Sequence, residues 1–147
     1  MRHITQEGID LIKRFEGFSS TVYFCPAEYP TIGYGHVVKK GEDFSAGITQ
    51  DEAEELLRTD AQIAERAVLR LITVPLTDGQ FDALVSFTYN LGSGALQRST
   101  LRRVINRQNH SKVPNQLMRW VWAGGRKLKG LARRREAESI FYVYPHL

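Results

Sequence analysis

The chain has 147 residues, of which 42% are hydrophobic, and this is enough to bury one core, so we expect a single domain over residues 1–147. No apolar run approaches the roughly 20 residues of a membrane span, and the single cysteine excludes an internal disulfide framework or a cysteine-based metal cluster. The net charge of +4 is uneven, because residues 1–73 carry 8 Lys and Arg against 12 Asp and Glu, whereas residues 74–147 carry 12 against 4.

The first predicted element is a helix over about residues 5–16. Ile9, Ile12 and Glu16 recur at helical spacing, and Gly17 directly afterwards favours a helix end. A carboxylate in the last turn meets the negative end of the helix dipole, which together with partial burial favours its protonated form. This would suit a general acid, although the same spacing is also typical of a solvated Glu at a helix end.

Residues 17–48 are expected to form a small β lobe. Residues 21–24 and 31–34 are rich in β-prone side chains, and Pro26 and Pro30 interrupt the loop between them. We expect a sheet of two or three short strands in this lobe, carrying Cys25 and Thr31.

The chemistry of the chain is concentrated between residues 16 and 36. Glu16 is an acid, Cys25 is a potential nucleophile or base, and Thr31 carries a hydroxyl that can hold a water molecule. These are the groups that hydrolysis of a glycosidic bond requires. From composition alone, Cys25 is either a small buried hydrophobic residue, as most free cysteines are, or a reactive thiol.

His36 ends the glycine-containing turn after Thr31, and we expect it to have a structural role. Hydrogen bonds or an ion pair from its ring would stiffen the sheet next to Glu16. The histidines of the chain lack the spacing of zinc ligands, so neither a metal nor another cofactor is predicted. The four histidines are His3, His36, His110 and His146.

The rest of the chain, residues 1–16 and 49–147, is expected to be helical. A capping box formed by Thr49 and Glu52 begins a long helix that reaches about Leu71 and could bridge the small lobe to a larger one. A second capping box, formed by Thr77 and Gln80, begins a helix that ends at Gly92. Further helices are expected after Ser99, from Pro114 to Gly124 and Gly125, and over about residues 131–142.

The positive charges of the second half gather between Arg126 and Arg135. This excess suggests a polyanionic neighbour, which could be nucleic acid, an anionic membrane surface or an anionic cell wall. The alternative is a solvated helix face that keeps the protein soluble. The residues concerned are Arg126, Lys127, Lys129, Arg133, Arg134 and Arg135.

The order of helix, small sheet, long helix and helical bundle resembles the phage-type lysozymes, the endolysins of glycoside hydrolase family 24. In that family, a catalytic Glu is followed after eight residues by Asp or Cys and after five more by Thr, and Glu16, Cys25 and Thr31 match this pattern. The resemblance covers nearly the whole chain and implies an α+β, mainly α, lysozyme-like fold. Further stretches similar to the family include residues 15–17, 25–27, 31–36, 80–87, 99–101, 119–120, 123–125 and 130–138.

This resemblance implies hydrolysis of the β-1,4 bond between N-acetylmuramic acid and N-acetylglucosamine in peptidoglycan. Glu16 would be the general acid, Cys25 the base, nucleophile or electrostatic partner, and Thr31 the residue that orients the attacking water in an inverting reaction. Most relatives have Asp where this chain has Cys25, and a thiol substitutes for a carboxylate charge only if its pKa is lowered from about 8.5. Residues expected to support the site are Gly33, Tyr34 and His36.

The biological setting implied is lysis of a bacterial host by a phage or prophage. Residues 1–6 lack the apolar core of a signal peptide, so we expect synthesis in the host cytoplasm, release through a holin pore and action on the wall as a monomer. Two alternatives belong to other classes. The thiol suggests a catalytically idle wall-binding module, and the charge of residues 126–135 suggests a nucleic-acid binder, although that run lacks interleaved aromatic residues.

Overall fold

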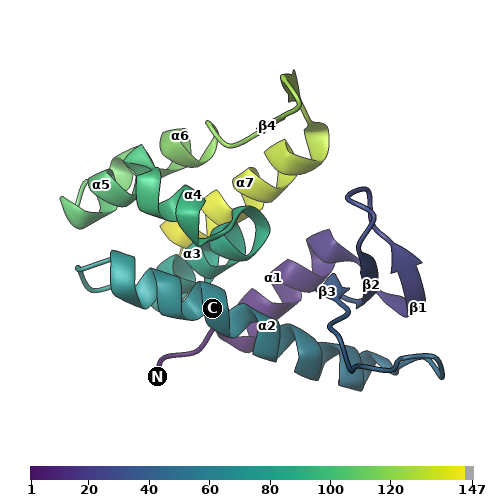
Figure 1. The fold of residues 1–147 in the computed structure, drawn as a ribbon. Coiled ribbons are helices and arrows are strands. Elements are labelled where there is room, and N and C mark those ends of the chain that lie inside the picture. Colours follow the sequence, from purple (N-terminus) through teal and green to yellow (C-terminus); the bar gives the residue numbers. More distant parts are fainter. Residues whose placement is uncertain (145–147) are drawn as a thin grey trace.

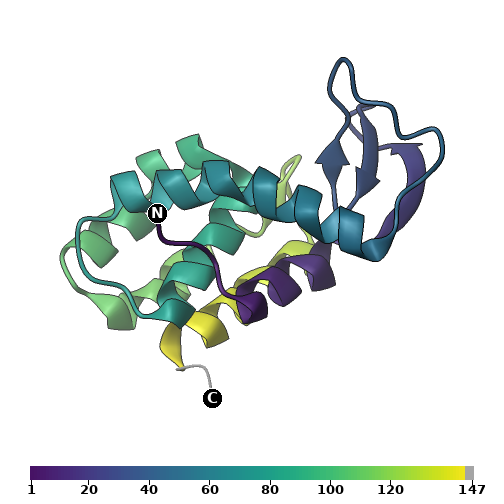
Figure 2. The same ribbon diagram turned by 90° about the horizontal axis from the view of Figure 1, so that it is seen from below.

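A small β-sheet and a bundle of helices lie at opposite ends of the 22-residue helix α2 (Gln50–Leu71), as Figures 1 and 2 show. The computed structural model describes residues 1–144. The other helices are α1 (Gln6–Glu16), α3 (Asp78–Leu91), α4 (Ser93–Arg98), α5 (Thr100–Asn106), the 3-10 turn η1 (His110–Lys112), α6 (Val113–Leu117) and α7 (Lys129–Val143). The strands are β1 (Ser19–Phe24), β2 (Pro30–Gly33), β3 (His36–Val37), β4 (Trp122–Ala123) and β5 (Arg126–Lys127).

The fold is α+β and mainly helical, as predicted from the sequence. The small lobe contains the antiparallel sheet β1-β2-β3, in which Tyr23 pairs with Thr31 and Ile32 pairs with His36. Thr31 therefore lies on β2, whereas Cys25 follows the end of β1 and opens the connection to β2. None of the helices within residues 1–144 is long and apolar enough to cross a membrane.

Helix α3 forms the centre of the helical lobe. Gly79 and every residue from Phe81 to Thr88 are buried, and α3 contacts α1, α2, α4 and α7. A helix that is buried on all sides must be surrounded by other helices, and this explains why the apolar residues of α3 do not form a single stripe. Side chains on this helix therefore reach both the core and the elements that build the site.

The first turn of α1 is held by two buried carboxylates from other helices. Glu65 on α2 accepts a hydrogen bond of 2.6 Å from the backbone N–H of Ile4, and Asp82 on α3 accepts one of 2.9 Å from that of Thr5. Thr5 also caps α1, since its hydroxyl accepts a hydrogen bond from the N–H of Gly8. These contacts fix the start of the helix whose last residue is Glu16.

The predicted helix starts at the two capping boxes are confirmed. Thr49 and Glu52 bond reciprocally at the start of α2, and Thr77 and Gln80 do the same at the start of α3. Ser99 caps α5 as expected.

The helix predicted from Pro114 to Gly124 and Gly125 is wrong beyond Leu117. Helix α6 ends at Leu117, and the chain then forms the hairpin β4-β5. Gly124 and Gly125 have φ values of 58° and 75°, which suit the two-residue turn of a hairpin better than the end of a helix. Two further differences are small: the short helix α4 was not predicted, and α7 begins at Lys129 rather than at about residue 131.

Candidate active site

Glu16 is the last residue of α1 and lines a pocket of about 330 Å³ between the two lobes. Gly17 ends the helix with a φ of 70°, and its N–H donates to the carbonyl of Lys13. The Glu16 side chain is 22% exposed, so it reaches the pocket while most of its surface is covered by other residues. The other residues that line the pocket are Gly35, His36, Val37, Lys39, Asp60, Ile63, Tyr89 and Asn90.

Gly35 allows the sheet to approach the Glu16 carboxylate closely. Its φ is 84°, and a Cβ atom at this position would lie 3.0 Å from Oε1 of Glu16. Both the backbone conformation and the lack of space therefore favour glycine. The Tyr89 hydroxyl meets the same turn, because it donates to the carbonyl of Tyr34 at 3.2 Å. Burial, followed by the charge of Glu16, raises the pKa of Tyr89 above its usual range.

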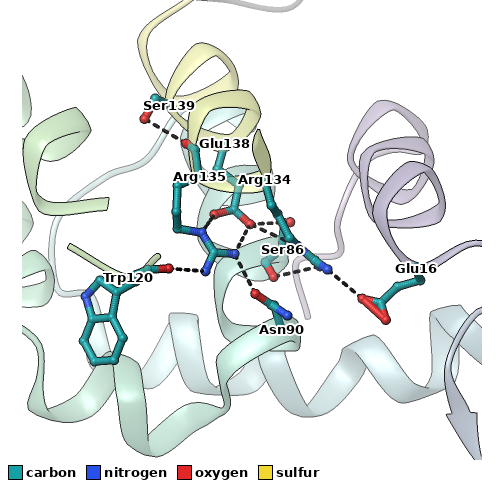
Figure 3. Close-up of polar contacts among 8 residues, drawn as sticks. All are labelled: Glu16, Ser86, Asn90, Trp120, Arg134, Arg135, Glu138 and Ser139. Carbon is teal, nitrogen blue, oxygen red and sulfur yellow. Dashed lines mark hydrogen bonds and ion pairs between the residues drawn. The ribbon is translucent and has the colours of Figure 1, made fainter. Parts of the chain in front are cut away.

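Arg134 on α7 forms an ion pair with Glu16 across 118 positions of the sequence. Its Nη1 donates to Oε2 of Glu16 at 2.6 Å, and its Nη2 donates to the carbonyl of Ser86 at 3.2 Å (Figure 3). Arg134 is 4% exposed, so the ion pair is largely shielded from solvent. The guanidinium fixes the direction of the carboxylate, a role that sequence analysis did not assign to any residue.

A buried polar cluster holds Arg134 in place. Glu138 is fully buried, and it accepts hydrogen bonds of 2.7 Å from Nε of Arg135 and 2.6 Å from the hydroxyl of Ser86. Arg135 also donates to the Asn90 side chain at 2.8 Å and to the Trp120 carbonyl at 3.3 Å (Figure 3). Burial raises the pKa of Glu138, and the charges and hydrogen bonds of its partners oppose that rise. Burial likewise lowers the pKa of Arg135, and the charge of Glu138 opposes that change.

The spacing of the charged residues on α7 could have indicated this cluster from the sequence. Arg134 lies four residues and Arg135 three residues before Glu138, so both guanidiniums share a helix face with that carboxylate. Ala137 and Tyr142 are also buried on this helix. The basic run was therefore misinterpreted in part, because Arg134 and Arg135 are internal. Its exposed members are Arg126, Lys127, Lys129 and Arg133.

Cys25 and Thr31 come together at the turn between β1 and β2, outside the set of residues that line the Glu16 pocket. The turn is closed by a hydrogen bond of 3.1 Å from the Cys25 N–H to the Tyr29 carbonyl, and Glu28 adopts a left-handed φ of 65°. A hydrogen bond from the Tyr29 backbone is the largest cause that lowers the pKa of Cys25, and the Thr31 hydroxyl contributes in the same direction. The thiol is half-buried rather than a core residue, so the local chemistry favours the reactive alternative.

His36 joins the sheet to α2 and to the loop that follows the sheet. It is buried, its Nδ1 lies 2.7 Å from Asp60 on α2, and its Nε2 lies 3.0 Å from Glu42. Burial disfavours the charged ring, but hydrogen bonds to both carboxylates outweigh this and raise the pKa of His36. The imidazolium thus ties β3 to α2 at the edge of the pocket.

Tyr34 and Gly33 support the sheet rather than the pocket. The Tyr34 ring is buried and packs against Phe18, with ring centroids 5.5 Å apart. Gly33 has a φ of 66°, and a Cβ atom there would lie 3.1 Å from that of Ala53 on α2. No group of three or more His, Cys, Asp or Glu side chains within residues 1–144 could hold a metal ion, and His146 lies outside the described residues.

A carboxylate at a helix end, facing the glycine turn of a small sheet and backed by a helical bundle, defines a lysozyme-like protein. Comparison with known proteins supports this class. The sequence profile of the phage lysozyme family matches residues 13–138. The muramidase domain of SpmX from Asticaccaulis excentricus superposes with a TM-score of 0.88 at 35% identity, over 98% of this chain and 100% of that domain.

Two phage proteins of similar sequence indicate the family to which the chain belongs. The endolysin of Bacillus phage B103 is 44% identical over 145 residues, covering 96% of this chain and 54% of that protein. The endolysin of Salmonella phage P22 is 36% identical over 144 residues, covering 96% of this chain and 99% of that protein. The chain thus spans about half the length of the Bacillus phage relatives that it matches. The chain belongs to the phage lysozyme family.

Proposed function

We propose that the protein hydrolyses the β-1,4 bond between N-acetylmuramic acid and N-acetylglucosamine in peptidoglycan. The observation that carries this proposal is the placement of Glu16, whose carboxylate lines the interlobe pocket next to Gly35 and is oriented by Arg134. In the reaction, Glu16 protonates the leaving glycosidic oxygen as general acid. Family membership supports the same assignment.

Cys25 and Thr31 supply the second catalytic group. Hydrogen bonds that favour the thiolate lower the pKa of Cys25, and we propose that this thiolate supplies the negative charge for which most relatives use a carboxylate. The Thr31 hydroxyl donates to the Tyr29 carbonyl at 2.9 Å, and it turns to donate to the Cys25 thiolate when the thiol is ionised. In either orientation, a lone pair of the Thr31 oxygen stays available to accept a hydrogen bond from the attacking water and so to orient it, in an inverting reaction.

The exposed basic residues promote contact with the anionic wall. Arg126 and Lys127 form strand β5 of the exposed hairpin, next to Trp122, whose side chain is 61% exposed. Lys129 and Arg133 continue this basic surface along α7. A cationic surface of this kind raises the local concentration of the protein at a polyanion.

The biological role that follows is that of an endolysin, which acts as a monomer on the host wall after synthesis in the host cytoplasm. Several similar phage proteins are called SAR-endolysins, including one from Bacteriophage PS119 that is 41% identical over 110 residues. We propose release through a holin pore.

Clearing of purified peptidoglycan tests the function against its alternatives. We expect turbidity to fall and soluble sugar fragments to appear after addition of the protein. An idle wall-binding module would sediment with the peptidoglycan without clearing it. A nucleic-acid binder would instead shift DNA in a gel at physiological ionic strength, and binding of this kind would weaken steeply with salt.

A further inference from the structure

Arg134 is shared unequally between two carboxylates. Its Nη1 donates to Glu16 at 2.6 Å, whereas its Nε lies 3.4 Å from Oε2 of Glu138 and makes no hydrogen bond among the described residues. A buried N–H group without an acceptor is costly. Arg134 therefore gains a hydrogen bond if it moves toward Glu138 when Glu16 releases it.

The charges of the cluster balance only while Glu16 is ionised. Arg134 and Arg135 carry two positive charges, and Glu16 and Glu138 carry two negative charges (Figure 3). A general acid must be protonated before it donates, and protonation of Glu16 leaves the two guanidiniums with Glu138 as their remaining carboxylate partner within residues 1–144. Glu138 is positioned to hold Arg134 in that state.

Other charged or titratable groups face Glu16 from each element around it. Tyr89 lies on α3, Asp60 on α2, and His36 and Lys39 belong to the β lobe. Asp60 is already paired with His36, and Tyr89, like other tyrosines, is neutral at physiological pH, since burial raises its pKa further above the ordinary value of about 10. Arg134 is the group in direct ionic contact with Glu16, so changes in its environment reach the carboxylate most strongly.

We infer that Glu138 is a positioning residue for the catalytic acid, which acts by competing with Glu16 for Arg134. Its negative charge weakens the hold of Arg134 on ionised Glu16 and thereby keeps the protonated, proton-donating form of Glu16 accessible. This role rests on the proposed function of Glu16 as general acid. It predicts that removing Glu138 and removing Arg134 change the protonation of Glu16 in opposite directions.

Titration of the Glu16 carboxyl group by carbon-13 NMR tests the inference without relying on activity. In Glu138→Gln, the guanidinium acts on Glu16 without a competitor, so we expect the midpoint of the Glu16 titration to fall by about 0.5 pH unit. In Arg134→Gln, ionised Glu16 loses its cation, so we expect the midpoint to rise by about 1 pH unit or more. If peptidoglycan is hydrolysed, the alkaline limb of the pH–activity profile should move with the midpoint in each variant.

Matched controls on the same helix separate this effect from a general change of charge. Glu136→Gln and Arg133→Gln make the same chemical changes at exposed positions and should leave the Glu16 midpoint in place. Midpoints that move in the same direction in Glu138→Gln and Arg134→Gln, or that equal those of the controls, would overturn the inference.

A milder variant serves if Glu138→Gln fails to fold. Ser86 donates a hydrogen bond of 2.6 Å to Oε2 of Glu138, the oxygen that faces Nε of Arg134. Ser86→Ala frees that oxygen for Arg134, so the Glu16 midpoint should rise slightly, and a fall would overturn the inference. If the wild-type protein does not cleave peptidoglycan but the midpoints shift as expected, the proposed function fails while the competition for Arg134 stands.

Discussion

The two walls of the pocket are built in different ways. The β-lobe wall is the edge of a thin sheet, in which five of the six residues of β1 are exposed. The turn from Cys25 to Tyr29, which lies outside the pocket lining, is held by backbone hydrogen bonds. The helical wall presents Arg134, which is backed by the fully buried pair of Arg135 and Glu138. The exposed or half-buried residues of this sheet, including Cys25, can therefore be changed at little cost in stability, whereas Arg134, Arg135 and Glu138 are part of the core.

Glu16 lies between these walls, and its replacement should have the largest effect. Glu16→Gln keeps the shape of the side chain but removes the transferable proton, so the rate of peptidoglycan clearing should fall by about 10²–10⁴-fold. Circular dichroism should show an unchanged fold. Activity close to that of the wild type at equal concentration of folded protein would contradict the assignment of Glu16.

The helical wall is tested next by Arg135→Met. This change leaves the buried Glu138 carboxylate without its closest cation, and breaking a buried ion pair costs about 3–5 kcal/mol of unfolding free energy. Urea unfolding measures the loss. Arg133→Met on the exposed face of α7 is the matched control, and its effect should stay within about 0.5 kcal/mol. Equal effects of the two variants would show that the cluster does not contribute as described.

Substitution of Cys25 in the β lobe should have the opposite effect to Arg135→Met, because it should lower activity and leave stability nearly unchanged. We expect Cys25→Ser to reduce the clearing rate by about 10²-fold, at the lower end of what a proton-transfer group contributes, with little change in unfolding free energy. Cys25→Asp should keep substantial activity because it restores the anion that most relatives carry. Alkylation and peroxide should inactivate the wild type, and thiol should reverse early oxidation. Full activity of Cys25→Ser would remove Cys25 from the mechanism.

His36 joins the two walls and gives a pH-dependent prediction. Its pKa is raised in the folded protein, so its contribution to stability is complete below the unfolded value of about 6.5 and is lost as the pH rises through the folded value. His36→Gln should therefore lower the unfolding free energy by about 2 kcal/mol at pH 5.5 and by less at pH 9. Urea unfolding at both pH values measures this, and a larger loss at pH 9 would contradict the ion pairs with Asp60 and Glu42.

The smallest effect concerns the exposed basic hairpin. Salt screens charges beyond about 10 Å at 0.1 M, so activity on whole walls should fall with salt more steeply than activity on short soluble oligosaccharides. Replacing Arg126 and Lys127 with Glu should bring the salt dependence on whole walls closer to that on oligosaccharides, with changes in rate of a few-fold, because both side chains are exposed. An equal salt response on both substrates would leave these residues as a solubility feature.

The same contrast between the walls explains what the sequence could predict. Glu16, Cys25 and Thr31 lie within one short segment, so their spacing was visible, and the capping residues of α2 and α3 act on their immediate neighbours. Arg134 lies 118 positions from Glu16 in the sequence and meets it only through tertiary packing. A run of three arginines is also typical of a solvated surface, and the burial of two of them depends on packing against α3, which periodicity does not specify.

The hairpin β4-β5 was missed for a related reason. Gly124 and Gly125 interrupt a helix and also form a tight hairpin turn, so the same two residues favour both structures. Contacts outside this segment decide between them, including the hydrogen bond from Arg135 on α7 to the Trp120 carbonyl. Such long-range contacts are absent from any local pattern.

The central claim, Glu16-dependent hydrolysis of the glycan strand, is tested most directly by mass spectrometry of the products released from purified peptidoglycan. The account predicts muropeptides that end in N-acetylmuramic acid with a free reducing end, each heavier by one water than its anhydro form, and no such products from Glu16→Gln. Anhydro-sugar ends, cleavage confined to the peptide cross-links, or the same products from the variant would contradict it.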